Sequence, residues 1–275
     1  MKTLCIVGAG KVGQVFGRQF ATHRVFEVRQ VLTRSKQSAQ AAAEFVGAGE
    51  AAGSWGELRQ ADVYLLGVPD DSIAASCDAM TQQGLLNADS VVFHCSGAKA
   101  STELSAALGA GAAVASVHPV RSFADTAAVS SDFAGTICSV EGDVRALAVL
   151  APALESIGAQ VVQISADNKL LYHAGSVVAS NYLVSLMDLA LRTYEAAGIP
   201  PSMAQAMAAP LARQTLENVF KLGTAQALTG PIARDDMLTV EKQLQKMEDW
   251  DTDAGGVYRA FIPVTQALAR RKKQS

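Results

Sequence analysis

The first residues with a chemically meaningful spacing are three glycines near the start of the 275-residue chain. A short apolar segment at residues 4–7 leads into them, and a stretch with helically spaced apolar side chains follows. Between a strand and a helix, such glycines permit a tight turn, close approach of a diphosphate and close packing of helix on strand. Free N–H groups at the start of the helix bind phosphate oxygens. The pattern predicts a dinucleotide site formed by Gly8, Ala9, Gly10, Lys11, Val12 and Gly13.

A basic turn lies about 20 residues beyond the glycines, where sites of this kind select their cofactor. A strand is predicted over residues 26–33, and it ends in Thr33, Arg34 and Ser35. A site for NAD places an acidic side chain here, which holds the ribose 2′-hydroxyl. A guanidinium and two hydroxyls suit a 2′-phosphate instead. The turn therefore favours NADP, and the alternative is a solvated basic turn without a ligand.

Polar side chains also follow two strands predicted later in the chain. Val68, Pro69 and Asp70 end a strand over residues 62–68, where a loop over the cofactor is expected. Ser96 follows a strand over residues 90–95. Because ligands bind at the carboxyl ends of parallel strands, Ser96 is expected to contact cofactor or substrate. The alternative for Ser96 is a hydroxyl that only caps the next helix.

His118 follows the next predicted strand, over residues 113–117, and precedes Pro119. An unperturbed histidine titrates near pH 6.5, which suits exchange of a proton with a substrate. We therefore treat His118 as a candidate catalytic residue. The alternative is a histidine that Pro119 and the loop backbone hold for structural reasons.

The elements that position these residues fall into two groups. Eight strand patterns alternate with helical patterns up to residue 164, which predicts a doubly wound parallel sheet. From residue 167 onward the patterns are helical: one helix of about 30 residues over 167–197, then helices over 202–222, 234–248 and 254–271. The fold class predicted is α/β, with an N-terminal domain of residues 1–165 and an all-helical domain of residues 166–275.

The long helical stretch contains the most apolar segment of the chain, residues 174–191. Five polar side chains interrupt it, more than a membrane span ordinarily tolerates, so a buried helix is the better interpretation. Burial against a second subunit as well as its own domain is expected. The sequence therefore predicts a homodimer, formed through the helical domain.

Composition excludes several classes of function. The net charge is −3 and the pI is about 5.8, which gives no electrostatic footprint for nucleic acid or an anionic membrane. The four cysteines and four histidines lack ligand spacing, so no metal site is predicted. The cysteines indicate buried, reduced thiols, and Met1 leads directly into a strand without a signal peptide. A cytoplasmic location is expected.

Four further stretches carry a resemblance to known proteins. They are residues 94–98, residues 118–123, residues 172–182 and residues 228–235. With the glycine loop and the helical second half, they resemble the 6-phosphogluconate dehydrogenase-like superfamily. That group includes β-hydroxyacid dehydrogenases, pyrroline-5-carboxylate reductase and deazaflavin-dependent NADP reductases. The chain is most similar to a family of NADP oxidoreductases with a Rossmann-like N-terminal domain and a helical C-terminal domain of unknown function.

The resemblance implies roles for several residues. Ser96 matches a serine that binds substrate in β-hydroxyacid dehydrogenases. A serine followed by His-Pro is similar to prephenate dehydrogenases, whose histidine receives the substrate's hydroxyl proton, and this points to His118. β-Hydroxyacid dehydrogenases also carry Lys and Asn one turn apart on the long helix, a pair that is absent here. Residues at helical spacing are instead Lys169, His173, Val177 and Asn181.

His173 and Asn181 are therefore expected to line the substrate cleft. The absent lysine is the usual general acid of these enzymes. Either His173 or His118 replaces it, or this protein catalyses a different reaction. The alternative for both residues is a structural role in the core, with their hydrogen bonds satisfied within the protein. Arg234 is expected at the start of a helix, where a cation is mildly unfavourable. Binding of a carboxylate, including one in a partner's active site, would explain Arg234. A surface ion pair with a neighbouring acid is the alternative.

Two functions of different kinds follow. The first is an NADP(H)-dependent oxidoreductase that transfers hydride to or from a small polar metabolite, as carbonyl and hydroxyl or as imine and amine, in a cleft between the domains. The second is a non-catalytic NADP-binding sensor or scaffold. The polar residues at the strand ends favour catalysis, and the missing Lys and Asn pair favours the sensor.

Overall fold

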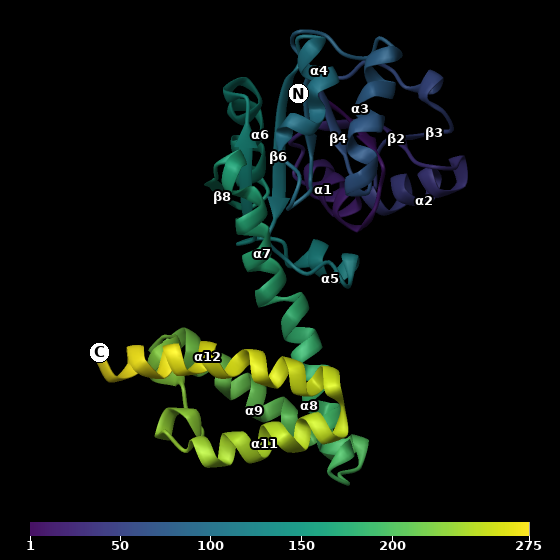
Figure 1. Ribbon diagram of the computed structural model, residues 1–275. Coiled ribbons are helices and arrows are strands. Elements are labelled where there is room, and N and C mark those ends of the chain that lie inside the picture. The colour runs from purple at the N-terminus through teal and green to yellow at the C-terminus, as the bar shows by residue number, and fades with distance from the viewer. Residues whose placement is uncertain (275) are drawn as a thin grey trace. The chain divides into compact units, whose positions relative to one another are not determined.

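The computed structural model describes residues 1–274 (Figure 1). These residues divide into two compact units. The first unit is Met1–Val178, and the second runs from Ala179 onward. Each unit is described by itself below.

The first unit is built on one sheet of eight strands, at the eight places where the sequence predicts them. The strands are β1 Thr3–Val7, β2 Glu27–Leu32, β3 Glu50–Ala52, β4 Val63–Leu66, β5 Val91–His94, β6 Ala113–Pro119, β7 Ile137–Gly142 and β8 Gln160–Gln163. Their spatial order is β3-β2-β1-β4-β5-β6-β7-β8. The order reverses between β1 and β4, which makes the gap between these strands the topological switch point.

The prediction of a wholly parallel sheet is wrong at one pair of strands. β7 runs antiparallel to β6, with His118 opposite Ser139 and Pro119 opposite Cys138. The Val120 N–H donates to the Ile137 carbonyl, so the chain re-enters the sheet at the edge where β6 ends. A strand that starts at that edge must run back along its neighbour, whereas a parallel strand needs a crossover to the opposite edge. β8 is parallel to β7.

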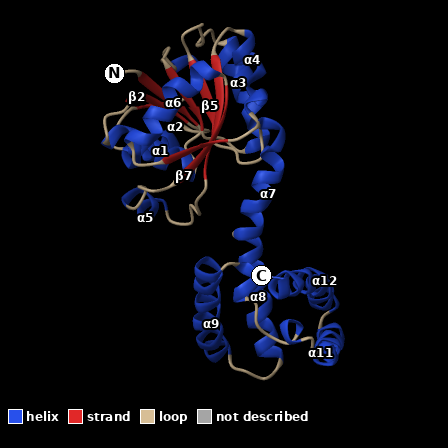
Figure 2. Cartoon of the chain, turned by 90° about the vertical axis from the view of Figure 1, so that its left-hand side faces the viewer, coloured by secondary structure: helices blue, strands red, loops and turns tan. Residues whose placement is uncertain are grey.

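Helices cover both faces of the sheet, as Figure 2 shows. One face packs against α1 Lys11–Thr22, α2 Lys36–Val46, α5 Thr126–Ser131 and α6 Val144–Ser156. The other packs against α3 Ile73–Gln82 and α4 Ser105–Gly109. The strands supply alternate residues to the two cores, so that Leu4 and Ile6 face one layer while Cys5 and Val7 face the other. This confirms the doubly wound arrangement.

Several short elements differ from the sequence-based expectation. The helix expected at residues 54–60 is only a 3₁₀ turn, η1 Trp55–Glu57. Three further 3₁₀ turns are η2 Asp70–Ser72, η3 Ser101–Leu104 and η4 Ala166–Asn168. The four cysteines are free, and Cys5, Cys77 and Cys138 are buried as predicted, whereas Cys95 is partly exposed. Burial raises the pKa of Cys5 to about 11 and of Cys138 to about 12.

The prediction of one continuous helix over residues 167–197 is wrong. The chain forms α7 Lys169–Ala179 and α8 Asn181–Ala196. Ser180 separates them, because its backbone (φ −121°, ψ −69°) departs from helical geometry. Asn181 therefore begins a new helix and does not continue the spacing of Lys169 and His173.

The remaining elements of the second unit are helical, as predicted. They are α9 Pro201–Leu222, α10 Thr224–Ala227, the 3₁₀ turn η5 Ile232–Arg234, α11 Met237–Trp250 and α12 Thr252–Gln274. α10 lies where the sequence predicts a loop. Arg192 of α8 forms an ion pair of 2.5 Å with Asp251, between α11 and α12, and its guanidinium lies over the Trp250 ring.

The expectation that the most apolar helical segment, residues 174–191, is buried is also wrong within a single chain. No residue of α8 is buried, and Lys169 is the one buried residue of α7. The segment Ala166–Ala196 is long and apolar enough to cross a membrane by length and composition, and none of its apolar window is buried. That pattern is weak evidence for a membrane span.

Candidate functional site at the carboxyl edge of the sheet

The glycine loop after β1 is packed against the loop after β4, at the switch point. Gly8 has a φ of +78°, and a Cβ there would lie 2.8 Å from the Val68 nitrogen. A Cβ on Gly13 would lie 2.8 Å from the Gly8 carbonyl oxygen. A Cβ on Gly67 would overlap the same oxygen. Backbone therefore fills the space where side chains would be, which confirms the turn and close-packing roles predicted for Gly8 and Gly13.

The first turn of α1 presents unpaired backbone donors. Gly10 is its N-cap and offers no side-chain hydrogen bond, and no acidic residue lies in the first turn. The positive end of the helix dipole is thus left without a compensating carboxylate. Lys11 is exposed, and its Nζ donates to the Ala124 carbonyl at 2.9 Å. N–H groups at a helix start of this kind bind phosphate oxygens, so the diphosphate role of Gly8 through Gly13 stays a prediction.

The turn after β2 starts α2. Ser35 caps this helix, because its hydroxyl accepts from the Ser38 N–H at 3.2 Å. The Thr33 hydroxyl donates to the Ser35 carbonyl at 3.0 Å. Arg34 is exposed and has no hydrogen-bond or ion-pair partner within residues 1–274. The guanidinium is therefore free to meet a ligand, while the two hydroxyls also shape the turn.

Ser96 joins the ends of β4 and β5. Its hydroxyl donates to Asp70 Oδ2 at 2.7 Å and accepts from the N–H groups of Ala98 and Lys99. The Ser96 N–H donates to Nδ1 of His94, whose Nε2 meets the Ala100 carbonyl at 3.1 Å. The Ser96 hydroxyl therefore closes the turn over residues 96–99 and fixes the Asp70 carboxylate. The helix-capping role given as its alternative is not seen, because Ala100 is the N-cap of the next helical turn, η3. Burial lowers the pKa of His94, which acts as a neutral structural side chain here.

His118 lies within β6 and has aromatic neighbours on α7. Its Nδ1 lies 2.9 Å from the Tyr172 hydroxyl, and its ring meets the rings of Tyr172 and His173 edge to face, with centroids 5.7 and 5.5 Å away. Burial lowers the pKa of His118 to about 4, and His173 and Lys169 add to the effect. The pKa of His118 therefore lies below the value near 6.5 of an unperturbed histidine, because desolvation disfavours the imidazolium.

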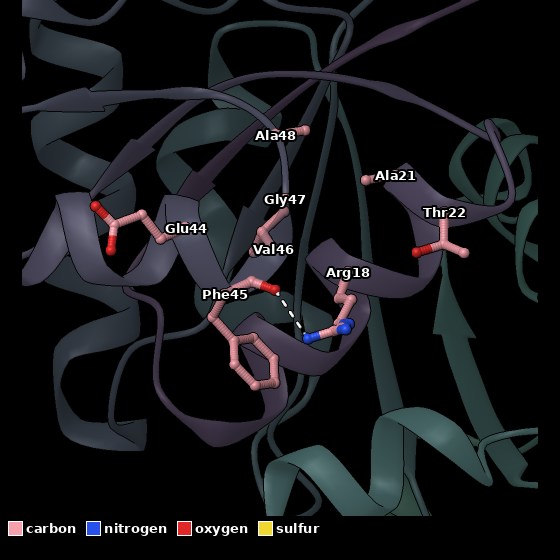
Figure 3. A pocket seen from close by; sticks show the side chains of 8 residues that line it. All are labelled: Arg18, Ala21, Thr22, Glu44, Phe45, Val46, Gly47 and Ala48. Atoms are coloured by element: carbon pink, nitrogen blue, oxygen red, sulfur yellow. Dashed lines mark hydrogen bonds between the residues drawn. The ribbon is translucent and has the colours of Figure 1, made fainter.

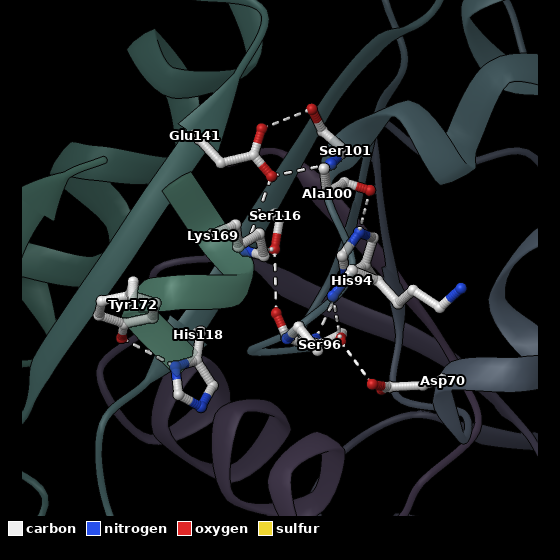
Figure 4. Close-up of polar contacts among 12 residues, drawn as sticks. Asp70, His94, Ser96, Ala100, Ser101, Ser116, His118, Glu141, Lys169 and Tyr172 are labelled. Atoms are coloured by element: carbon white, nitrogen blue, oxygen red, sulfur yellow. Dashed lines mark hydrogen bonds and ion pairs between the residues drawn. The ribbon is translucent and has the colours of Figure 1, made fainter. Parts of the chain in front are cut away.

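A buried polar network lies behind these residues and is drawn in Figure 4. Lys169 has a side chain 1% exposed, and its Nζ donates to the Ser116 hydroxyl at 2.6 Å. The same Nζ lies 3.6 Å from Glu141 Oε1. Glu141 accepts from the N–H and hydroxyl of Ser101, and the Ser116 hydroxyl donates to the Ser96 carbonyl at 3.3 Å. The network ties α7 to β5, β6 and β7.

Lys169 has its pKa lowered by burial, and Glu141 opposes that shift. Sequence reasoning gave no site role to Lys169, Glu141, Ser116 or Tyr172. Glu141 and Ser116 sit among apolar strand residues, and polar residues inside strand patterns that are otherwise apolar are the signal that could have found them. Lys169 belongs to the helical series of the sequence analysis, but it has no predicted role because Asn is missing one turn later.

The structure brings Ser96, His118 and His173 together with Asp70 at one edge of the sheet. Asn181 and Arg234 belong to the second unit, and both are exposed. The prediction that Arg234 opens a helix is wrong. Arg234 ends the turn η5, Asp235 has a φ of 64°, and Asp236 caps α11 by accepting from the Thr239 N–H.

Two hollows of the described residues lie away from this edge of the sheet. Figure 3 shows a hollow of about 280 Å³ between the ends of α1 and α2, where Arg18 donates to the Phe45 carbonyl at 3.3 Å and stacks on its ring. A second, of about 350 Å³, lies beside Thr3, Arg29 and Asp62. Both lie toward the amino ends of the strands. Among residues 1–274, no three His, Cys, Asp or Glu side chains are grouped to hold a metal ion.

The doubly wound sheet with a glycine loop at its switch point defines a Rossmann-like domain, and residues 2–119 match the model of that domain. Residues 136–263 match a domain of unknown function, DUF2520. The chain thus joins a Rossmann-like domain to a DUF2520 domain, whose matched region begins just before β7.

Solved structures have a similar fold. A protein from Thermotoga maritima is 26% identical, with a TM-score of 0.77 over 98% of this chain and 100% of that one. A protein from Bacteroides fragilis assigned as an NADP oxidoreductase is 18% identical, with a TM-score of 0.72 over 100% and 98%. Pyrroline-5-carboxylate reductase from Coxiella burnetii is 14% identical, with a TM-score of 0.59 over 99% and 98%. No curated protein matches the chain.

Proposed function

We propose that the protein is an NADP(H)-dependent oxidoreductase that acts on a small polar metabolite. The observation that carries the proposal is the continuity of one sheet edge. The glycine loop packs on the loop after β4, Asp70 of that loop is held by Ser96, and the histidine cluster lies at the neighbouring strand ends. The names of the structural neighbours, which include reductases and dehydrogenases, support the same class.

The residues present fit a nicotinamide dinucleotide. The glycine loop and the N–H groups of α1 would hold its diphosphate, and the loop Val68–Asp70 would face its ribose. The bound cofactor supplies hydride exchange. Arg34 carries the preference for NADP, because a guanidinium binds a 2′-phosphate by charge-assisted hydrogen bonds and has no counter-ion in residues 1–274.

His118 is the proton acceptor in the direction of alcohol or amine oxidation. Its low pKa keeps the imidazole neutral at physiological pH, as a base requires. Tyr172 occupies Nδ1 and fixes the ring, which leaves Nε2 to take the substrate proton. In the direction of reduction the same nitrogen passes to the substrate a proton that it takes up from water. The His173 ring lies beside that of His118. Carbonyl and imine substrates are both compatible with this proton transfer.

Calorimetric titration with NADPH and then NADH tests the cofactor. We expect tighter binding of NADPH, and loss of that preference in Arg34→Ala. Arg59→Ala is the matched control, because Arg59 is exposed and pairs with Glu50 away from the glycine loop. Equal binding of NADPH and NADH would contradict the proposed preference for NADP. Binding of neither would contradict the proposed cofactor site.

Oxidation of NADPH against a panel of carbonyl and imine compounds tests catalysis. We expect turnover with a member of the panel, reduced at least a hundredfold in His118→Gln while NADPH still binds. Tight NADPH binding without turnover on any compound would favour the sensor or scaffold. Asn181 and Arg234 stay candidates for substrate binding, and unchanged KM in Arg234→Ala would end the carboxylate role.

We also propose that the protein is a homodimer formed through its helical unit. The described part of that unit buries few apolar side chains, chiefly Ala204, Ala208, Val240, Ala254 and Ala269. Larger ones are exposed, including Val184 at 70% and Phe220 at 85%. A second copy would bury this surface. Light scattering should give a dimer mass at micromolar concentration, and a monomer mass would contradict the proposal.

A further inference from the structure

One nitrogen of the histidine cluster is unexplained by the fold. Nδ1 of His173 is buried and has no hydrogen-bond partner within residues 1–274. Leaving a polar atom buried and unpaired is unfavourable by more than a typical hydrogen bond contributes. Such an atom needs a compensating role, and a ligand that completes the hydrogen bond supplies one.

Gly97 is the residue against which this nitrogen lies. A Cβ built on Gly97 would overlap His173 Nδ1 and would stand 2.8 Å from His118 Nε2. Both separations are shorter than real Cβ contacts. Two imidazole nitrogens, one from β6 and one from α7, therefore lie where a side chain on Gly97 would be. They can approach each other there because Gly97 has no side chain.

The backbone does not explain why this position is a glycine. Gly97 is absent from the eleven glycines with positive φ, so an alanine could adopt its conformation. The atoms that a methyl group would strike are the ends of side chains and no backbone atom. An alanine at this position would therefore displace the two rings while the loop keeps its fold.

We propose that Gly97 is a positioning residue, which lets His118 Nε2 and His173 Nδ1 hold one hydroxyl or amine group of the substrate between them. The proposal rests on the proposed function and names the group that the site takes. A hydroxyl or amine both donates and accepts a hydrogen bond, so it can satisfy one ring nitrogen that accepts and another that donates at once. A carboxylate only accepts, and a neutral His118 ring is a poor match for its charge. The low pKa of His118 is consistent with that neutral ring.

The first experiment is the NMR titration of the histidine rings in the protein without substrate. In Gly97→Ala the displaced rings gain solvent, and we expect the pKa of His118 to rise from about 4 toward its ordinary value. Gly109→Ala is the matched control, because Gly109 ends α4 with open space around its Cβ and no positive φ. An unchanged His118 titration in Gly97→Ala would overturn the proposal.

The second experiment measures kinetics on a substrate found by the NADPH screen. We expect kcat/KM to fall at least tenfold in Gly97→Ala, with the affinity for NADPH and the melting temperature close to those of Gly109→Ala. Wild-type kcat/KM in Gly97→Ala would overturn the proposal. Absence of turnover in the wild type would instead count against the proposed function, and the NMR result would still decide the role of Gly97.

A double variant keeps the test decisive if Gly97→Ala is unstable. In a His173→Ala background the methyl group no longer meets the ring that it overlaps most. We expect Gly97→Ala to lower stability and to shift the His118 pKa less in that background than in the wild type. Additive effects would show that Gly97 acts through something other than the histidines, and the proposal would then be abandoned.

Discussion

The two edges of the sheet in the first unit differ in the side chains that they bring together. The amino edge has a hollow lined by ordinary surface side chains such as Arg18 and Glu44. The carboxyl edge collects the partly buried His118 and His173 and the buried Lys169 and Glu141. Because strand direction places successive loops at one edge, groups that can do chemistry gather there. The chemistry of its side chains identifies the site.

The largest expected effect is from breaking the buried ion pair at the carboxyl edge. Lys169→Met leaves Glu141 buried without its cation, and the free energy of unfolding should fall by about 3–5 kcal/mol. Chemical denaturation measures the change. The double variant Lys169→Met with Glu141→Gln should recover part of the loss, since no buried charge then lacks a partner. A loss under about 1 kcal/mol in Lys169→Met would show that the pair is not buried as described.

Acid should destabilise the carboxyl edge through His118. Its folded pKa of about 4 lies below the value near 6.5 expected when unfolded, so the unfolded state binds the proton more readily. The stabilisation is therefore complete above pH 6.5 and is lost as the pH falls toward 4, by at most about 1.4 kcal/mol per pH unit. Denaturation curves between pH 4 and 7 should show a smaller slope with pH in His118→Gln. An identical slope would contradict the neutral histidine.

Removing the hydroxyl that joins two strand ends should have an intermediate effect. Ser96→Ala leaves Asp70 without its donor and the N–H groups of Ala98 and Lys99 without their acceptor, and we expect a loss of about 1–2 kcal/mol. The matched variant at the amino edge is Asp62→Ala, which removes two bonds of 2.7 Å to Thr3. Both should be destabilised to a similar degree, but only Ser96→Ala should weaken NADPH binding. An equal loss of NADPH affinity in both variants would contradict the proposal that only the carboxyl edge binds the cofactor.

The smallest effect is expected in the hollow of Figure 3. Arg18→Ala removes a guanidinium that is stacked on Phe45 at the surface, and stability should change by about 0.5 kcal/mol or less. NADPH affinity and turnover should stay at the wild-type level. A clear loss of either would mean that the amino-edge hollow is functional, and the comparison between the edges would have to be reversed.

Much of the first unit could be predicted from sequence because its signals are local. The glycine loop, the eight strands and the polar residues at their ends depend on neighbouring residues and on the period of two along a strand. The direction of β7 and the break at Ser180 could not be predicted in this way. An apolar run has the same pattern in parallel and antiparallel strands, and Ser180 is a residue that helices commonly tolerate.

The sequence by itself determined the doubly wound order of elements, the glycine loop and the identity of Ser96, His118 and His173 as candidates. Only the tertiary structure decided that two histidines meet at Gly97, that Lys169 is buried against Glu141, and that burial lowers the pKa of His118. These properties depend on desolvation and on contacts between residues more than 20 positions apart. No local pattern encodes the distance between two side chains, because packing of the whole sheet and α7 sets it.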